Sequence, residues 1–261
     1  MNRVQGEPVV AMAGVTKHFG SGAHVLSNVS FAVQQAEFVS ILGPSGCGKS
    51  TILRLAAGLD APSAGTVLAP ALNTSIRGAT AFVFQEATLM PWTSVFNNVW
   101  LPLRLQGVSK EDARVRIEAA LRGVGLEDFA QAYPAQLSGG MKMRASIARA
   151  LITEPKILLM DEPFAALDDI SRQRLNNDLL RWQQDRGIAT LFVTHNIAEA
   201  VFLSRRVLVM GAKPGRITYE LTIDEPYPRL SAFRNTDNFI LYCRTLSAAL
   251  MKNNERDGEA T

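Results

Sequence analysis

The chain has 261 residues, of which 47% are hydrophobic and 20% charged, and this length and composition can bury one substantial core. Its 27 Lys and Arg residues against 24 Asp and Glu give a net charge of +3 without a long basic run, which argues against a nucleic-acid partner. Only two cysteines, no apolar run of about 20 residues and no apolar signal segment within Met1–Pro8 predict a cytoplasmic protein without a membrane span.

The N-terminal part of the chain predicts strands. Val9–Val15 and Val29–Val33 have strand character, and the second alternates apolar and polar residues as a half-buried strand does. Glu37–Leu42 predicts a strand that leads into a glycine-rich loop. Residues 66–84 are strand-like again and end just before Gln85.

The loop after Leu42 has the spacing G-x-x-x-x-G-K-[ST], and residues 50–57 predict a helix that leaves it. Glycines allow successive backbone N–H groups to face phosphate oxygens, and the N-terminal end of the helix favours negative charge. Lys49 can reach the β- and γ-phosphates, and the Ser50 hydroxyl can bind Mg²⁺. A chance glycine turn is the alternative, and the strand–loop–helix context disfavours it. The candidate nucleotide-binding residues are Gly43, Pro44, Ser45, Gly46, Cys47, Gly48, Lys49, Ser50 and Thr51.

From Val95 to about Ala150 the pattern becomes helical. Ser109 is typical of a helix cap, and apolar residues recur beyond it at helical spacing. Further on, Leu137-Ser138-Gly139-Gly140 precedes a helical stretch with an apolar face. We call these four residues the signature segment. A serine hydroxyl and glycine N–H groups at a helix N-terminus can form a second anion site, although four such residues alone are also typical of a plain turn.

Two continuous apolar runs, at residues 156–160 and 189–193, predict parallel strands that are covered on both faces. Asp161 and Glu162 follow the first, and His195 follows the second after Thr194. Ligands bind at the carboxyl ends of strands in open α/β sheets, so these side chains are candidates for the reaction. Residues 207–219 then predict a closing hairpin, and a mostly helical tail follows Pro226 and frays from Asn253.

Taken in order, these motifs resemble those of the ATP-binding subunits of ABC transporters, over residues 9 to about 220. The resemblance implies an α/β fold: a P-loop NTPase (RecA-like) core with an antiparallel β subdomain and a helical insertion carrying the signature. We therefore expect an ATPase domain at residues 1–225, with the insertion at about 86–154, and a C-terminal helical tail at residues 226–261.

The resemblance also implies roles for individual residues. Ser138, Gly139 and Gly140 would complete the nucleotide site of a second subunit, so that a homodimer closes around two Mg²⁺-ATP. Glu162 is the expected general base that polarises the attacking water. The expected catalytic residues are Glu162, His195, Gln85 and Lys49. The expected metal ligands are Ser50, Gln85 and Asp161. Asp161 is expected to act through a water molecule, because Mg²⁺ keeps part of its hydration shell.

Two further residues match the family, and each has a structural alternative. Phe19 stands where family members stack an aromatic ring on adenine, but it could also be a core residue. Asp168 ends the loop Phe164–Asp168, which crosses the dimer seam in the family, but it could also be an ordinary cap of the following helix.

Finer features resemble the importer ATPases for nitrate, sulfonates, taurine and related small organic solutes. They include Phe84-Gln85-Glu86, the segment Leu89–Trp92, Asn97-Asn98-Val99 and residues 213–217. This likeness implies a peripheral subunit on the cytoplasmic face of the membrane. It would drive a separate integral membrane permease, which a solute-binding protein supplies. Trp92 would contact that permease or simply fill a groove.

Three alternatives remain at this stage: an importer ATPase for another solute class, a soluble ABC ATPase that acts on DNA or ribosomes, and a small-molecule phosphotransferase. The second usually carries coiled-coil insertions, zinc motifs or two cassettes, and the third leaves the signature segment unexplained. One departure from the family is Met143, which stands where glutamine usually precedes the arginine of the helix after the signature segment.

Overall fold

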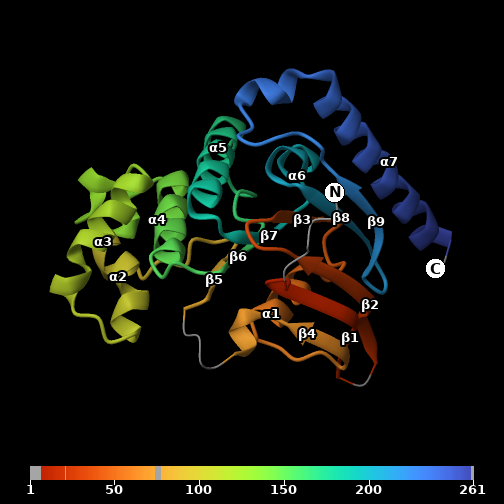
Figure 1. Cartoon of the computed structure of the whole chain (residues 1–261), viewed down its shortest axis with the longest axis horizontal. Coiled ribbons are helices and arrows are strands. Elements are labelled where there is room, and N and C mark those ends of the chain that lie inside the picture. The colour runs from red at the N-terminus through yellow and green to blue at the C-terminus, as the bar shows by residue number, and fades with distance from the viewer. Residues whose placement is uncertain (1–6, 21, 74–77, 260–261) are drawn as a thin grey trace.

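The computed structural model describes residues 7–20, 22–73 and 78–259, which form a large and a small sheet with helices around them (Figure 1). Residues 1–6, part of the expected strand-like region (74–77) and the last two residues of the tail lie outside this description. Among the described residues, no helix is both long and apolar enough to cross a membrane.

The small sheet has the strand order β2-β1-β4, and both of its strand pairs are antiparallel. Its strands are β1 (Val10–Phe19), β2 (Ala23–Val33) and β4 (Ala64–Leu68). This is the antiparallel β subdomain that we expected. β1 and β2 are longer than predicted, because their pairing continues from Val10 opposite Val33 to Phe19 opposite Ala23, beyond the apolar alternation.

The expectation of strand structure throughout residues 66–84 is wrong. β4 ends at Leu68, and Pro70–Leu72 forms a short 3-10 helix. Proline has no N–H to donate to a sheet ladder, so a strand is interrupted there. β5 (Thr80–Val83) then pairs with the large sheet instead of the small one.

The large sheet has the order β5-β6-β7-β3-β8-β9 and is parallel except for its edge strand β9. The further strands are β3 (Phe38–Leu42), β6 (Ile157–Asp161), β7 (Ala189–Thr194), β8 (Arg206–Gly211) and β9 (Arg216–Thr222). The apolar runs are buried because helices or the small sheet cover both faces. Alternate residues of one strand therefore join two different cores, as Phe38 and Val39 do.

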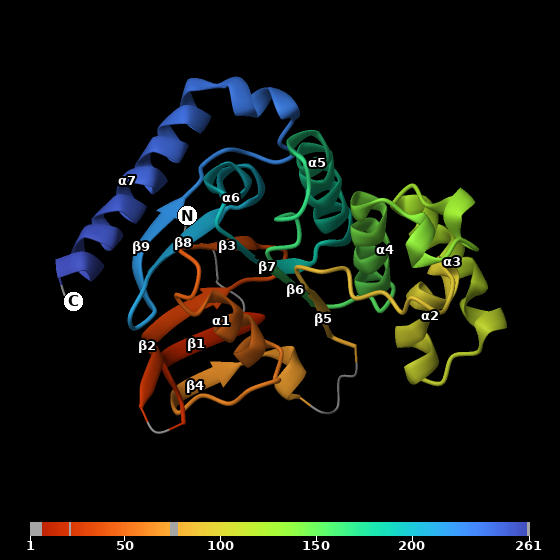
Figure 2. The ribbon, with the colours of Figure 1, turned by 180° about the vertical axis from the view of Figure 1, so that it is seen from behind.

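Helix α1 (Lys49–Ala56) lies between the large and small sheets, whereas α5 (Asp169–Arg186) and α6 (Ile197–Leu203) cover the opposite face of the large sheet (Figure 2). This arrangement places the start of α1 at the carboxyl end of β3. The carboxyl ends of β6 and β7 lie at the same edge, because these strands run parallel to β3.

The helical insertion lies at one end of the molecule, beyond β5 and β6 (Figures 1 and 2). It contains α2 (Val95–Leu105), α3 (Lys110–Gly123) and α4 (Gly139–Leu151). Ser109 caps α3 as predicted, because its side chain accepts a hydrogen bond from the Asp112 N–H. The predicted apolar face of α3 is buried in the core.

The C-terminal helix α7 (Asp237–Glu259) crosses the outer side of β8 and β9 (Figure 1). It continues to Glu259, so the fraying that we expected from Asn253 onward is wrong. Asn253 is buried, and its Nδ2 donates to Thr218 Oγ1 at 2.7 Å. A hydrogen bond to β9 thus holds this part of α7, where the polar sequence suggests a frayed C-terminus.

Candidate functional site

The phosphate loop, residues 43–51, connects β3 to α1, as the sequence predicts. Two of its glycines are required by their surroundings. Gly48 caps α1 with a φ of 98°, and a Cβ there would lie 2.6 Å from Leu26 Cδ2. A Cβ on Gly43 would lie 2.9 Å from the carbonyl oxygen of Met210. The close packing against neighbouring segments therefore fixes the backbone of the loop.

Lys49 is a buried residue at the start of α1, and its amine faces the loop. Its Nζ donates to the carbonyl oxygens of Gly43 and Pro44, at 2.9 Å each. The same Nζ lies 3.4 Å from Glu162 Oε1. The ammonium group is thus held beside the loop, within reach of an anion bound there.

A cleft of about 350 Å³ opens in front of the loop and brings together residues that are far apart in the sequence. Gln85 reaches it from the segment after β5, and Asp161 and Glu162 reach it from the end of β6. The lining residues are Val25, Ser45, Gly46, Gly48, Lys49, Ser50, Thr51, Gln85, Asp161 and Glu162. Gln85, Asp161 and Glu162 therefore converge with the phosphate loop on one polar site, whose lining does not include Gly43, Pro44 and Cys47 of the loop.

Three oxygen-bearing side chains of this cleft suit a hard cation. Ser50 Oγ donates to Asp161 Oδ1 at 3.0 Å, and Gln85 lines the same space. Burial raises the pKa of Asp161, so a cation beside it would relieve the cost of its charge. Among the described residues no cluster of three or more His, Cys, Asp or Glu could hold a metal. A hydroxyl, one carboxylate, an amide and water fit Mg²⁺, which keeps several waters when bound.

Glu162 and His195 form a direct contact at the edge of the cleft. His195 Nδ1 lies 2.8 Å from Glu162 Oε2, and the histidine ring is otherwise exposed. Glu162 adopts a left-handed backbone with a φ of 44°, a conformation that costs energy for a residue with a side chain. Such strain is typical of functional positions. The pair can accept a proton from a water molecule in the cleft and hold the resulting charge.

The signature segment lies elsewhere. Ser138 caps α4, and its Oγ accepts a hydrogen bond from the Met141 N–H at 3.3 Å. Gly139 and Gly140 form the first turn of that helix, so the residues of the predicted second anion site do lie at a helix N-terminus. It borders a separate cleft of about 270 Å³, which shares none of its described lining residues with the phosphate-loop cleft. One chain therefore does not bring the two anion sites together.

The structure also decides between alternatives for three residues. Asp168 caps α5 by accepting from the Ser171 N–H at 2.9 Å, and this hydrogen bond lowers the pKa of its carboxyl. The helix cap is thus observed, and it uses Oδ1 of Asp168, so Oδ2 of this exposed carboxylate is available for a further contact. Phe19 is 45% exposed, so its assignment to the core is wrong. Trp92 is 76% exposed, so it does not fill a groove in this chain.

Met143, the departure from the family pattern, is buried in the core below α4. The adjacent Arg144 donates to the Val124 carbonyl at 2.8 Å and pairs with Asp178 at 2.6 Å. The methionine thus acts as a packing residue, away from the phosphate-loop cleft.

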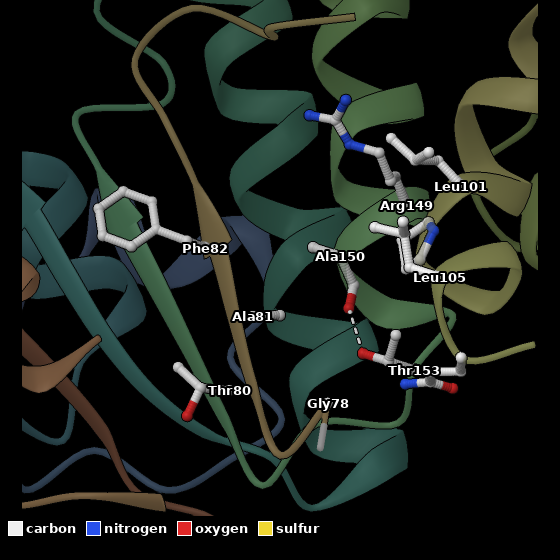
Figure 3. A pocket seen from close by; sticks show the side chains of 11 residues that line it. Gly78, Thr80, Ala81, Phe82, Leu101, Leu105, Arg149, Ala150 and Thr153 are labelled. Atoms are coloured by element: carbon white, nitrogen blue, oxygen red, sulfur yellow. Dashed lines mark hydrogen bonds between the residues drawn. The ribbon is translucent and has the colours of Figure 1, made fainter. Parts of the chain in front are cut away.

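A further cleft, of about 410 Å³, lies between β5 and the helices α2 and α4 (Figure 3). Its walls are largely apolar, with Leu101 and Leu105 on the α2 side and Ala81 on the β5 side, whereas the Phe82 ring points away from it. Leu105 is 75% exposed. This cleft lies where the helical insertion meets the sheet, and it is a candidate docking surface.

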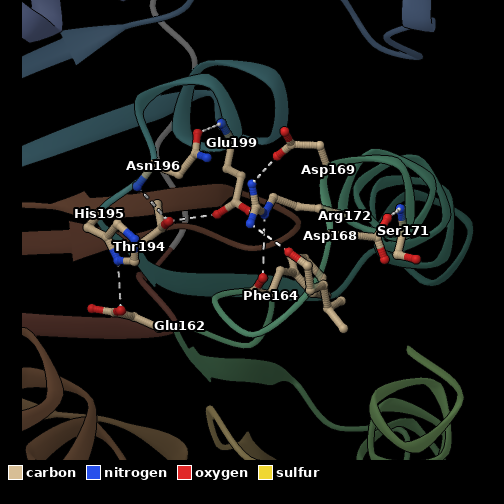
Figure 4. A network of polar contacts seen from close by, with 11 residues as sticks. Glu162, Phe164, Asp168, Asp169, Ser171, Arg172, Thr194, His195, Asn196 and Glu199 are labelled. Atoms are coloured by element: carbon tan, nitrogen blue, oxygen red, sulfur yellow. Dashed lines mark hydrogen bonds and ion pairs between the residues drawn. The ribbon is translucent and has the colours of Figure 1, made fainter. Parts of the chain in front are cut away.

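Sequence reasoning missed a pair of residues behind the site, Arg172 and Glu199. They connect the loop Phe164–Asp168 to the segment around His195 (Figure 4). The spacing of Asn196 and Glu199 matches a capping box, a signal that could have directed attention to Glu199. Nothing local in the sequence indicates its partner Arg172.

The chain is similar to known proteins over most of its length. The family described as ABC transporter matches residues 26–165. The nitrate import ATP-binding protein NrtD of Synechocystis sp. is 41% identical over 90% of this chain and 91% of its own length. The aliphatic sulfonates import ATP-binding protein SsuB 2 of Pseudomonas syringae pv. tomato is 45% identical over 80% of this chain and 85% of its own.

Among solved structures, a dimeric post-hydrolysis state of the ATP-binding cassette MJ0796, bound to ADP and Pi, resembles the fold with a TM-score of 0.73. It is 34% identical, and the match covers 83% of this chain and all of that one. The family match at residues 26–165 spans both the phosphate loop and the helical insertion.

Proposed function

The chain belongs to the ABC transporter family of ATP-binding proteins, and we propose that it hydrolyses ATP as a homodimer that drives a membrane importer. The observation that carries the proposal is the separation of the two anion sites within one chain. A second copy can bring its signature segment to the phosphate loop of the first, and the related cassette MJ0796 is described as dimeric.

In this proposal each ATP is bound by the phosphate loop of one subunit. Lys49 leaves the carbonyls of Gly43 and Pro44 for the β- and γ-phosphates, and Phe19 stacks on the adenine. Ser50, Asp161 and Gln85 would hold Mg²⁺, which neutralises charge on the phosphate oxygens when bound. Ser138, Gly139 and Gly140 of the partner cover the γ-phosphate from the other side.

Hydrolysis then needs a positioned water molecule more than a covalent nucleophile. Glu162 accepts the proton of that water, and Gln85 helps to orient it. His195 Nδ1, 2.8 Å from Glu162, fixes the direction of the carboxylate, and in the imidazolium form the ring can also donate to the γ-phosphate from Nε2. Asp168 lies on the loop that we assign to the dimer seam, so closure of the dimer completes the site before the reaction.

We also propose that the cleft beside β5 receives a helix of the membrane permease. Leu105 exposes a large apolar side chain in this cleft (Figure 3), and Trp92 exposes another in the segment that precedes α2. An exposed apolar surface of this kind suits an apolar partner. The import names of the relatives support a permease partner and a solute such as nitrate or a sulfonate. The proposal also includes a peripheral position on the cytoplasmic face of the membrane, with taurine among the candidate solutes. A solute-binding protein would act on the permease and not on this chain.

The Glu162→Gln variant tests the enzymatic part of this proposal. Loss of the general base should reduce phosphate release from Mg²⁺-ATP by a factor of about 10² to 10⁴ while ATP binding remains. Turnover like that of the unmodified protein would show that another group accepts the proton. Release of phosphate only with an added acceptor would instead favour the phosphotransferase alternative.

The docking surface is tested with Leu105→Glu and the matched control Val115→Glu. Val115 is 76% exposed on α3, and Leu105 is 75% exposed in the cleft, so both changes put a charge on an exposed aliphatic position. Leu105→Glu should abolish copurification with a coexpressed permease and leave the ATPase rate of the isolated chain unchanged. Equal copurification of both variants would contradict the assignment of this cleft.

A further inference from the structure

A polar network lies behind the Glu162–His195 pair, on the side away from the phosphate loop (Figure 4). Its centre is the ion pair between Arg172 of α5 and Glu199 of α6, with Arg172 Nε 3.4 Å from Glu199 Oε1. Neither residue lines the phosphate-loop cleft. Any effect of the pair on the reaction must therefore pass through the segments that it connects.

Arg172 holds the loop that carries Asp168. Its Nη2 donates to the Leu167 carbonyl at 2.7 Å, and its Nε lies 3.4 Å from the Phe164 carbonyl oxygen. The guanidinium thus fixes the backbone of the loop between Glu162 and Asp168. Its remaining contact, from Nη1 to Asp169 at 2.6 Å, lies on the exposed side of α5.

Glu199 holds the segment that carries His195. Thr194 Oγ1 donates to Glu199 Oε2 at 2.6 Å, and the same Thr194 Oγ1 accepts from the Asn196 N–H at 2.9 Å. Asn196 in turn accepts from the Glu199 N–H, so the backbone is fixed on both sides of His195. Burial raises the pKa of Glu199, whereas Thr194 and Arg172 oppose that rise by stabilising the carboxylate.

These contacts form a closed ring. From Glu162 the chain leads to Phe164, then through Arg172, Glu199 and Thr194 to His195, which contacts Glu162 again. Glu199 is buried and Arg172 is half-buried, so desolvation offsets much of the stability that their charge pair contributes, while the hydrogen bonds around the pair define one geometry. A displacement of the loop at Phe164 would therefore be passed to the histidine segment.

We propose that Arg172 and Glu199 are positioning residues, which transmit closure of the partner subunit on the Asp168 loop to the Glu162–His195 pair. This inference rests on the proposed function, because it assumes hydrolysis at Glu162 and a dimer seam at Asp168. It makes the rate of hydrolysis, and not the binding of ATP, depend on the Arg172–Glu199 contact.

Steady-state kinetics of Arg172→Lys and Glu199→Gln test the proposal. Lysine keeps the charge but cannot contact both the loop carbonyls and Glu199, so kcat should fall by about 10- to 100-fold, the loss typical of a displacement near 1 Å. KM for ATP should stay within about two-fold of the unmodified value, because no ATP contact is removed. Asp169→Asn is the matched control: it removes the exposed partner of Arg172 and should leave both constants unchanged.

A double variant separates a positioning role from a general structural one. If Glu199 acts through His195, then His195→Ala/Glu199→Gln should be no more than about two-fold slower than His195→Ala alone. Losses that multiply in the double variant, or a raised KM at unchanged kcat, would overturn the inference. Arg172→Lys decides the question by itself where Glu199→Gln fails to fold.

The Glu162→Gln variant distinguishes a failure of the positioning role from a failure of the proposed function. If Glu162→Gln abolishes hydrolysis but Arg172→Lys has the kcat of the unmodified protein, only the positioning role is wrong. If Glu162→Gln hydrolyses ATP normally, the proposed function itself fails.

Discussion

The phosphate loop and the signature segment are two candidate anion sites, which share a glycine-bearing helix N-terminus and differ in the side chains around it. Each places glycines at the N-terminus of a helix, α1 in one case and α4 in the other. The cleft at the loop contains a lysine and two carboxylates, whereas the cleft at the signature segment contains neither. The phosphate-loop cleft therefore has the groups to bind ATP and to hydrolyse it, whereas the cleft at the signature segment has groups that can only contact a bound phosphate. This division is the reason why the proposed function includes a second copy of the chain.

Lys49→Ala and Ser138→Arg should show the largest effects, and they should do so at different steps. Both should reduce ATP hydrolysis by at least about 10²-fold, as loss of a phosphate-stabilising donor does. Lys49→Ala should also weaken ATP binding to the monomer, because it removes a charge from the loop. Ser138→Arg should leave monomer binding unchanged, as measured by titration with a fluorescent ATP analogue.

Ser109→Arg is the control for Ser138→Arg. Both serines are exposed and cap a helix of the insertion by accepting a backbone hydrogen bond, so both changes cost about 0.5–2 kcal/mol of helix stability. Only the change at Ser138 should abolish hydrolysis. Equal ATPase rates in the two variants would contradict the role of the signature segment.

Asp161→Asn should separate activity from stability within the phosphate-loop cleft. Because burial raises the pKa of Asp161, its ionisation costs stability in the nucleotide-free protein, and this cost appears as the pH rises above the ordinary value of 3.8. The variant should therefore have a higher Tm than the unmodified protein at pH 7 without Mg²⁺, and the difference should shrink as the pH falls toward 4. Its Mg²⁺-dependent hydrolysis should be lost. A lower Tm at pH 7 would contradict the assigned pKa direction.

Met143→Gln should affect the insertion without affecting the reaction. An amide without partners in this core should cost about 1–3 kcal/mol of unfolding free energy, measured by denaturant titration. The ATPase rate per folded molecule should not change. Met251→Gln, at an exposed position of α7, is the control and should leave the unfolding free energy unchanged. A stable but slow Met143→Gln variant would place this residue in the catalytic coupling.

Phe19→Ala should give the smallest effect. A stacked ring contributes roughly 0.5–1.5 kcal/mol beyond burial, so KM for ATP should rise by about two- to ten-fold at unchanged kcat. Tyr219→Ala, which removes an exposed ring on β9, should change neither constant. An unchanged KM in Phe19→Ala would exclude the stacking role.

The sequence predicts the parts of this structure that depend on local patterns. β3, β6 and β7 are recognisable because both of their faces are buried and their side chains are almost continuously apolar. The loop at Gly48 is recognisable because its left-handed backbone requires glycine. The convergence of Asp161 and Glu162 on this loop then follows from parallel strand order.

Other parts depend on contacts between distant segments, which leave little local trace. The pairing of Arg172 with Glu199 joins two helices, and neither helix has a pattern that specifies its partner. Asn253 of α7 is held by a hydrogen bond to Thr218 of another element, β9. The division of residues 66–84 between two sheets likewise follows from the packing around them and not from their strand propensity.

The molecular mass of Glu162→Gln in solution tests the central claim most directly, because this variant should retain ATP without hydrolysing it. Light scattering after size exclusion should give 28.4 kDa without nucleotide and twice this mass with Mg²⁺-ATP. Glu162→Gln/Ser138→Arg should remain at the monomer mass with ATP, and Glu162→Gln/Ser109→Arg should dimerise. A monomer in every case, or a dimer that forms in spite of Ser138→Arg, would contradict a nucleotide site shared between two chains.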